Sequence, residues 1–276
     1  MANIYQLNED FDEASGLRAW IRTQEDGTDE TKDLPLNQAM VLRWCKERGF
    51  DVDSPGFSFE KPNKNGKTPL HVAVWLEELE IVKEIVNHVK SLETQDNDKA
   101  TALLLACSTK NRDTTSVLLK KGAKVGVQNI YGNTPLHRAQ SKRGGTQVAR
   151  LLLDSDHIDI NQKNADDKTA LHLACEMGNE PMVDLLLECG ADRNCQDCAG
   201  YTPLHAAIIS RCVAIVKKLL EQGANTAIKD NSGRDAVMTA KTRKYRCSEI
   251  IKLVQEHERR INLHRLSHTK ISGAAR

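Results

Sequence analysis

Four histidines recur in this 276-residue chain in a pattern that suggests metal-binding or acid–base chemistry. Each closes a tetrapeptide, Thr-Pro-Leu-His or Thr-Ala-Leu-His, and they are His71, His137, His172 and His205. Imidazole is a common metal ligand and general base. We expect these residues to lie about 10 Å apart in successive layers, which is too far for one coordination sphere. Each imidazole is therefore predicted to hydrogen-bond the backbone of a neighbouring hairpin.

A C-x-x-C motif, Cys195-Gln196-Asp197-Cys198, is the second candidate for chemistry, with Cys189 and Cys212 nearby in sequence. Four thiolates would suit zinc, and two would suit a redox pair. No second C-x-x-C accompanies it, and we expect the sulfurs to lie in a hairpin arm, at its tip and at a helix end. We predict reduced thiols and no metal, and keep a metal-binding or redox protein using Cys195 and Cys198 as the alternative of another class.

Motifs of enzyme active sites are missing from the sequence. It contains no G-x-x-x-x-G-K-[ST], no G-x-S-x-G and no H-E-x-x-H. We therefore predict no catalytic residues, no cofactor and no enzymatic activity.

The tetrapeptide recurs with a period that indicates how the chain is built. It begins at Thr68, Thr101, Thr134, Thr169 and Thr202, and Asp235 opens a diverged sixth copy. The intervals are 33 residues, except for 35 between Thr134 and Thr169. A fixed period of this length is the signature of a repeat architecture.

Each repeat contains signals for a turn followed by two helices. An Asn/Asp-x-x-Gly turn precedes the tetrapeptide, as in Asn129 to Gly132. The Thr suits a helix N-cap, and proline suits the first turn because its missing N–H is not needed there. An apolar run such as Ile215 to Leu220 then predicts a second helix. Gly122, Gly190 and Gly223 are expected to end that helix in the left-handed conformation.

The 33-residue period and the tetrapeptide resemble those of the ankyrin-repeat family over residues 63–258. The resemblance implies an all-α fold, an ankyrin-repeat solenoid of stacked helix pairs with β-hairpin or loop fingers. The expected repeats are 63–95, 96–128, 129–163, 164–196, 197–229 and 230–258. The two extra residues of the third repeat are expected near Arg143 to Thr146 and near Ser155 to His157.

The flanking segments differ from the repeats in charge. Residues 1–33 hold nine Asp/Glu against three Lys/Arg, and residues 34–62 resemble a degenerate N-terminal capping unit that begins with half a repeat. Residues 259–276 form a basic C-terminal tail that we expect to fray, and a basic cluster runs from Lys241 to Arg246. The net charge of +1 and the lack of a long apolar segment argue against nucleic-acid and membrane partners.

The resemblance to ankyrin repeats also implies where a protein partner binds, namely the concave face and the hairpin tips. Counted from each Thr, these positions are the tip residues just before it and the residues seven and eight places after it. The residues predicted to bind a partner are Lys67, Trp75, Leu76, Ile130, Tyr131, Met177, Tyr201 and Ile209. Aromatic residues are frequent binding hot spots, although Trp75, Tyr131 and Tyr201 could instead pack on neighbouring repeats.

The leading functional hypothesis is a non-catalytic protein–protein interaction module: an adaptor, inhibitor or targeting subunit. One alternative is an inhibitor of a transcription factor resembling the NF-kappa-B inhibitors, and another is a microbial or viral effector acting in a host cell. The basic tail argues against the first alternative, whose family tail is acidic. Self-association of acidic and basic ends is a further alternative. Eight cysteines without a secretory signal predict the cytoplasm, with the nucleus as an alternative.

Overall fold

The computed structural model describes residues 36–54, 57–140, 144–242 and 247–273. Side chains are described for 39–261 within these ranges. The described part is helical, and its fingers contain turns and no strand. The helices are α2 (Leu36–Glu47), α3 (Pro69–Trp75), α4 (Leu79–Ile85), α5 (Ala102–Thr109), α6 (Arg112–Lys120), α7 (Pro135–Arg138), α8 (Gly145–Leu153), α9 (Ala170–Glu176), α10 (Glu180–Glu188), α11 (Pro203–Ile209), α12 (Val213–Glu221), α13 (Ala236–Lys241) and α14 (Ser248–Gly273).

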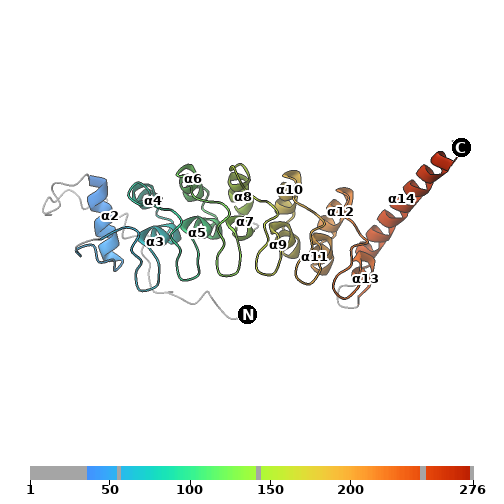
Figure 1. Cartoon of the computed structure of the whole chain (residues 1–276), viewed down its shortest axis with the longest axis horizontal. Coiled ribbons are helices and arrows are strands. Elements are labelled where there is room, and N and C mark those ends of the chain that lie inside the picture. Colours follow the sequence, from blue (N-terminus) through green and yellow to red (C-terminus); the bar gives the residue numbers. More distant parts are fainter. Residues whose placement is uncertain (1–35, 55–56, 141–143, 243–246, 274–276) are drawn as a thin grey trace.

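The helices form two parallel rows along one elongated stack (Figure 1). The inner row, which continues from the fingers, consists of α3, α5, α7, α9, α11 and α13. The outer row consists of α4, α6, α8, α10 and α12, and α14 packs on α12 and α13 at its end. The predicted all-α solenoid of stacked helix pairs is thus confirmed.

Each inner helix begins at the residue predicted to cap it. The hydroxyl of Thr68 accepts a hydrogen bond from the backbone N–H of His71, and Asp235 accepts one from Met238 in the same way. Thr134 and Thr202 accept the same hydrogen bond, and each is followed by a proline in the first turn of its helix. The cap residues therefore define the same point in every repeat.

Residues in the left-handed conformation mark two further points in the second to fifth repeats, and the first repeat has the first of these points. The first lies nine residues after the cap, at Glu77, Lys110, Gly178 and Arg211, but ten residues after it at Gly144. The second lies twelve residues later at Gly122, Gly190 and Gly223, but thirteen residues later at His157. The third repeat therefore contains one extra residue before Gly144 and one between Gly144 and His157. Residues 141–143, where part of the first insertion was expected, lie outside the described residues.

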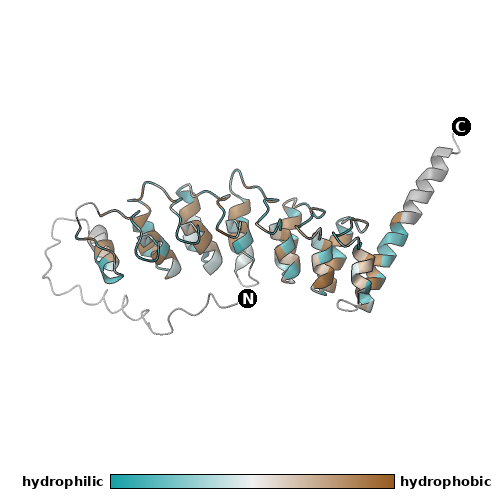
Figure 2. Ribbon diagram, turned by 60° about the horizontal axis from the view of Figure 1, so that its bottom comes forward, coloured by the Kyte–Doolittle hydropathy of each residue, from teal (hydrophilic) through white to brown (hydrophobic). Residues whose placement is uncertain are grey.

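The core runs continuously along the stack from α2 to α14. Small residues such as Ala73, Ala106 and Ala174 are buried where adjacent inner helices pack. Cys107 and Cys175 occupy equivalent buried positions, and burial raises the pKa of the Cys107 thiol to about 12. Both cysteines act there as small apolar side chains. Hydrophilic residues also occur along the helices (Figure 2), and charged ones of the outer row, such as Lys120 and Lys217, are exposed.

Helix α2 packs on α4 and covers the first end of the stack. It buries Val41, Trp44 and Cys45 there, and the following loop buries Phe50 and Phe59. This arrangement supports the interpretation of residues 34–62 as a capping unit. The aromatic side chains fill the space that a preceding repeat would otherwise occupy.

At the other end, α14 crosses the boundary expected at residue 258 and continues as one helix to Gly273 (Figure 1). The expectation that the chain frays after about residue 259 is therefore wrong over residues 259–273. Ile250 and Val254 bury the first turns of α14 against α12 and α13. The part of the basic cluster at residues 243–246 lies outside the described residues.

Candidate protein-binding surface

Each of the four tetrapeptide histidines links its own repeat to the finger of the next one. Nε2 of His71 lies 2.9 Å from the carbonyl oxygen of Ala100, and equivalent contacts join His137 to Lys168, His172 to Tyr201 and His205 to Arg234. A carbonyl oxygen only accepts, so Nε2 carries the proton. Nδ1 is then free to accept from the backbone N–H of the cap residue, which is 3.2 Å away for Thr68.

This geometry excludes a shared metal or catalytic role for these imidazoles. Both nitrogens of each ring already have backbone partners, and the rings are buried. Burial lowers the pKa of His71, His137, His172 and His205, and thus favours the neutral form that these bonds require.

The C-x-x-C cysteines lie on one finger but in different surroundings. Cys195 is half-buried and its thiol lies 3.2 Å from the carbonyl oxygen of Asp192, whereas Cys198 is exposed. Burial, followed by the nearby Asp192, raises the pKa of Cys195, the opposite of what activates a redox thiol. Within the described residues, no three His, Cys, Asp or Glu side chains are grouped so as to hold a metal ion.

The predicted binding residues lie on the fingers and at the C-terminal ends of the inner helices. Lys67, Ile130, Tyr131 and Tyr201 belong to fingers, whereas Trp75, Leu76, Met177 and Ile209 end α3, α9 or α11. Among the described residues, the most exposed large apolar side chains are Trp75 (53%), Leu76 (42%), Ile130 (46%), Tyr131 (50%), Met177 (52%) and Met238 (51%). Five of these six belong to the predicted set.

Trp75 and Lys67 form one local unit on the first repeat. The ammonium nitrogen of Lys67 lies 5.2 Å from the centre of the Trp75 ring, within the range of a cation–π contact. Lys67 lies just before the cap of α3, and Trp75 is the last residue of that helix. The contact holds the indole in one orientation while about half of its surface stays open to solvent.

Ile130 and Tyr131 are held at the tip of the third finger by backbone bonds to both neighbouring fingers. The N–H of Ile130 donates to the carbonyl of Asp98, and the carbonyl of Tyr131 accepts from the N–H of Ala165. A Cβ at Gly132 would lie only 2.5 Å from the nitrogen of Ala165, so glycine permits this approach. The tip backbone is therefore fixed, and both side chains point outward.

Met177 is the C-cap of α9, and the last residue of that helix takes part in an ion pair. The ammonium of Lys168 lies 2.6 Å from a carboxylate oxygen of Glu176, the residue before Met177. The residue that precedes the exposed Met177 therefore has its charge paired. Flexible methionine side chains adapt well to a partner surface.

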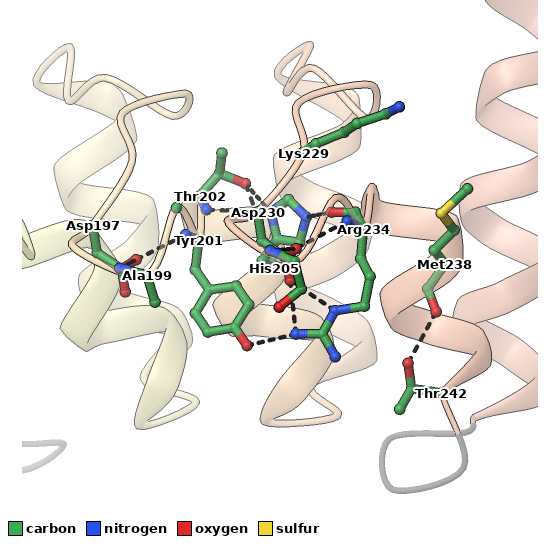
Figure 3. A network of polar contacts seen from close by, with 12 residues as sticks. Asp197, Ala199, Tyr201, Thr202, His205, Lys229, Asp230, Arg234, Met238 and Thr242 are labelled. Atoms are coloured by element: carbon green, nitrogen blue, oxygen red, sulfur yellow. Dashed lines mark hydrogen bonds and ion pairs between the residues drawn. The ribbon is translucent and has the colours of Figure 1, made fainter.

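Tyr201 and Ile209 are less available than the other predicted residues. Both are half-buried, and the Tyr201 hydroxyl accepts a hydrogen bond from Nη2 of Arg234 at 2.9 Å (Figure 3). Arg234 also binds the carboxylate of Asp230 at 2.8 Å. The ring of Tyr201 lies 5.9 Å from that of His205. Tyr201 therefore joins the last two fingers, which agrees with the alternative expectation that this tyrosine packs on a neighbouring repeat.

Met238 is an exposed residue that does not lie at one of the binding positions counted from each cap residue. It occupies, on α13, the tetrapeptide position that histidine holds in four of the other five repeats. No finger follows the last repeat among the described residues, so an imidazole would find no carbonyl to bind there. Replacement of His by Met in a terminal repeat is the sequence signal that could have identified it.

Comparison with known proteins identifies the family. The model for ankyrin repeats (3 copies) matches residues 55–129, 79–164, 142–230 and 171–265, which together exceed half of the chain. The chain therefore belongs to the ankyrin-repeat family. No helix in the described part of the chain is long and apolar enough to cross a membrane.

Individual relatives come from different biological settings. A putative ankyrin repeat protein of Fowlpox virus is 35% identical over 182 residues, covering 64% of this chain and 53% of the relative. A B-cell lymphoma 3 protein homolog of Mus musculus is 32% identical over 188 residues, covering 66% and 42%. The chain thus spans about half or less of the length of these two relatives.

Solved structures show the same fold. The crystal structure of EF0377, an ankyrin repeat protein, has a TM-score of 0.62 at 32% identity and covers 67% of this chain and 96% of its own. The ankyrin repeat domain of Bcl-3, described as a unique member of the IkappaB protein family, has a TM-score of 0.66 at 25% identity and covers 81% and 98%.

Proposed function

We propose that this chain is a non-catalytic module that binds a protein partner across its fingers and the ends of its inner helices. The observation that carries the proposal is the location of the exposed apolar side chains. Trp75, Leu76, Ile130, Tyr131 and Met177 all lie on this side, where a protein without a partner would expose them to water. Ankyrin repeats in general serve as protein-interaction modules, which supports the same function.

The physical mechanism is docking on a surface that is already ordered. The finger tips are fixed by backbone bonds between neighbours, such as that from Ala165 to Tyr131. Because the backbone does not need to be ordered on binding, less conformational entropy is lost. Exposed aromatic and thioether side chains then supply most of the binding free energy.

A variant with Trp75→Ala, Tyr131→Ala and Met177→Ala tests the proposal. Its matched control carries alanine at three exposed outer-row residues, Lys120, Glu188 and Lys217. Both are compared with wild type by affinity capture from cell extract and by thermal denaturation. We expect the variant at Trp75, Tyr131 and Met177 to lose captured proteins while keeping its melting temperature, and the control to behave like wild type. Equal capture by the two variants, or unfolding of the first one, would contradict the proposal.

The setting of this binding function is a finer proposal. Similarity to the B-cell lymphoma 3 proteins and to the Bcl-3 structure favours an inhibitor of a transcription factor that resembles the NF-kappa-B inhibitors. Similarity to the Fowlpox virus protein favours an effector acting in a host cell. Direct binding of the chain to purified NF-kappa-B would support the first setting. If the variant at Trp75, Tyr131 and Met177 loses captured proteins but the wild-type chain does not bind NF-kappa-B, the first setting is rejected. We propose the cytoplasm as the location, with the nucleus as an alternative.

A further inference from the structure

The side chains at the C-terminal end of α5 are shorter than those at the equivalent positions of α3. Trp75 and Leu76 end α3 and are exposed, whereas Ser108 and Thr109 end α5 and are half-buried. Arg138 of α7 borders the same place, since its Nε donates to the hydroxyl of Ser108 at 2.9 Å. We call the surface formed by Lys67, Trp75, Ser108, Lys110 and Arg138 the α5 site.

The α5 site contains three cationic side chains that have no ion-pair partner among the described residues. No ion pair joins Lys67, Lys110 or Arg138 to a carboxylate within the described part of the chain. The position of Lys67, just before a cap residue, is also held by Lys168 and Arg234 in later repeats. Those two cations are paired with Glu176 and Asp230. The α5 site therefore offers positive charge beside an exposed indole, which suits an acidic segment containing apolar side chains.

The chain itself contains one such segment before α2. Residues 9–13, Glu-Asp-Phe-Asp-Glu, contribute four carboxylates, and Leu17, Trp20 and Ile21 follow. From Ile21 to the start of α2 at Leu36 there are 15 residues, which span up to about 50 Å when extended. Since α2 packs on the first repeat and adjacent helices lie about 10 Å apart, the α5 site is within reach.

We propose that residues 9–21 occupy the α5 site of the same chain and compete with the protein partner. This inference rests on the proposed function, because it describes how that surface is regulated. A segment tethered to the protein has an effective concentration in the millimolar range, so even weak docking occupies the site much of the time. A partner must then displace the segment before it binds.

Binding of a labelled peptide of residues 1–33 to the full-length chain tests the proposal. In the wild-type chain the tethered segment competes with the peptide. In a chain with Asp10→Asn, Asp12→Asn and Glu13→Gln this competition weakens, and we expect the peptide to bind about tenfold more tightly. The matched control neutralises Glu25, Asp26 and Asp29, which changes the net charge equally outside residues 9–21, and is expected to bind like wild type.

Further variants assign the site. Adding Lys110→Ala and Arg138→Ala to the neutralised chain should abolish the gain in peptide binding. No binding of the peptide to the neutralised chain, or an equal gain in the control, would overturn the proposal. A wild-type chain that forms a dimer by light scattering, and separates when Asp10, Asp12 and Glu13 are neutralised, would place the segment on a second copy and also overturn it.

Partner capture separates this inference from the function on which it rests. If the neutralised chain captures no more protein than wild type, while the Trp75, Tyr131 and Met177 variant still loses captured proteins, the inference fails and the binding function stands. If that variant loses no protein although the peptide binds as expected, the partner function fails instead.

Discussion

The hydroxyl of Tyr201 accepts a hydrogen bond from Nη2 of Arg234, one finger further along the stack, at 2.9 Å. The same guanidinium binds the carboxylate of Asp230, whose side chain is almost completely buried. The first contact joins the last finger to the preceding one (Figure 3), and the second, within the last finger, pairs the charge of the guanidinium. They add to the backbone bond from Asn231 to Ala199 and to the contact of His205 with the carbonyl of Arg234, which also hold the last finger.

Tyr201→Phe is therefore expected to reduce stability rather than binding. The change removes one hydrogen bond to a charged group, which typically costs about 1.5 to 3 kcal/mol when buried and less at a half-buried position such as this one. Urea denaturation should show a lower midpoint, while partner capture stays at the wild-type level. Arg234→Ala, which removes the other side of the bond, should lower the midpoint at least as much. A loss of partner capture by a stably folded Tyr201→Phe chain would instead identify the hydroxyl as a binding group.

Stability is expected to fall in mildly acidic solution because of the buried histidines. Burial lowers the pKa of His71, His137, His172 and His205 below the ordinary value of 6.5. The unfolded chain consequently binds more protons than the folded chain as the pH drops below about 6.5. The contribution of the four histidines to the free energy of unfolding is complete above that pH. It declines below that pH, by up to about 1.4 kcal/mol per pH unit for each histidine.

Urea denaturation at several pH values between 7.5 and 5 measures this slope. His172→Gln should be less stable than wild type at pH 7.5, because its bonds to Thr169 and Tyr201 are disturbed. Its stability should also depend less on pH, since one titrating group has gone. If the free energy of unfolding of this variant depends on pH as strongly as that of wild type, other groups cause the acid sensitivity.

Two finger substitutions should change stability in opposite directions. Asp167 adopts a φ of 56° at the finger position that Gly132 holds at 69° in the preceding repeat. A residue with a side chain is strained in the left-handed backbone conformation, and glycine relieves that strain. Glycine also increases the entropy of the unfolded chain, but we expect this effect to be smaller. Asp167→Gly should therefore stabilise by roughly 0.5 kcal/mol.

Gly132→Ala is the opposite case. Its Cβ would lie 2.5 Å from the backbone nitrogen of Ala165, so the two fingers must separate. We expect it to destabilise by about 2 kcal/mol or more, given the combined strain and lost contacts. Thermal denaturation of both variants decides the question, and a stable Gly132→Ala chain would show that the fingers separate freely.

Removal of metal should leave the protein unchanged. Cys195 has a raised pKa and a backbone partner at Asp192, which does not suit a zinc thiolate. The melting temperature should be the same with and without a chelator, and a Cys195→Ser, Cys198→Ser chain should fold normally. Stoichiometric zinc in the purified protein, lost together with stability on chelation, would establish the metal-binding alternative.

The repeat architecture could be predicted because its signals are local and periodic. Thr68, its proline and His71 each act within one turn of helix or on the adjacent finger, so their roles follow from their places in the repeat. The exposure of the side chains on the candidate surface could be predicted only in part. The position rule includes Trp75 and Tyr201 equally, but only Trp75 is largely exposed.

The sequence by itself therefore determined the repeat fold, the caps of the inner helices and the backbone-bonding role of the histidines, since each depends on spacing along the chain. The tertiary structure decided which side chains stay open to solvent. Tyr201 is half-buried because Arg234 reaches back from the next finger, and Met238 is exposed because no finger follows it among the described residues. Exposure is set by the neighbouring repeat, and a position rule that treats every repeat alike does not include that neighbour.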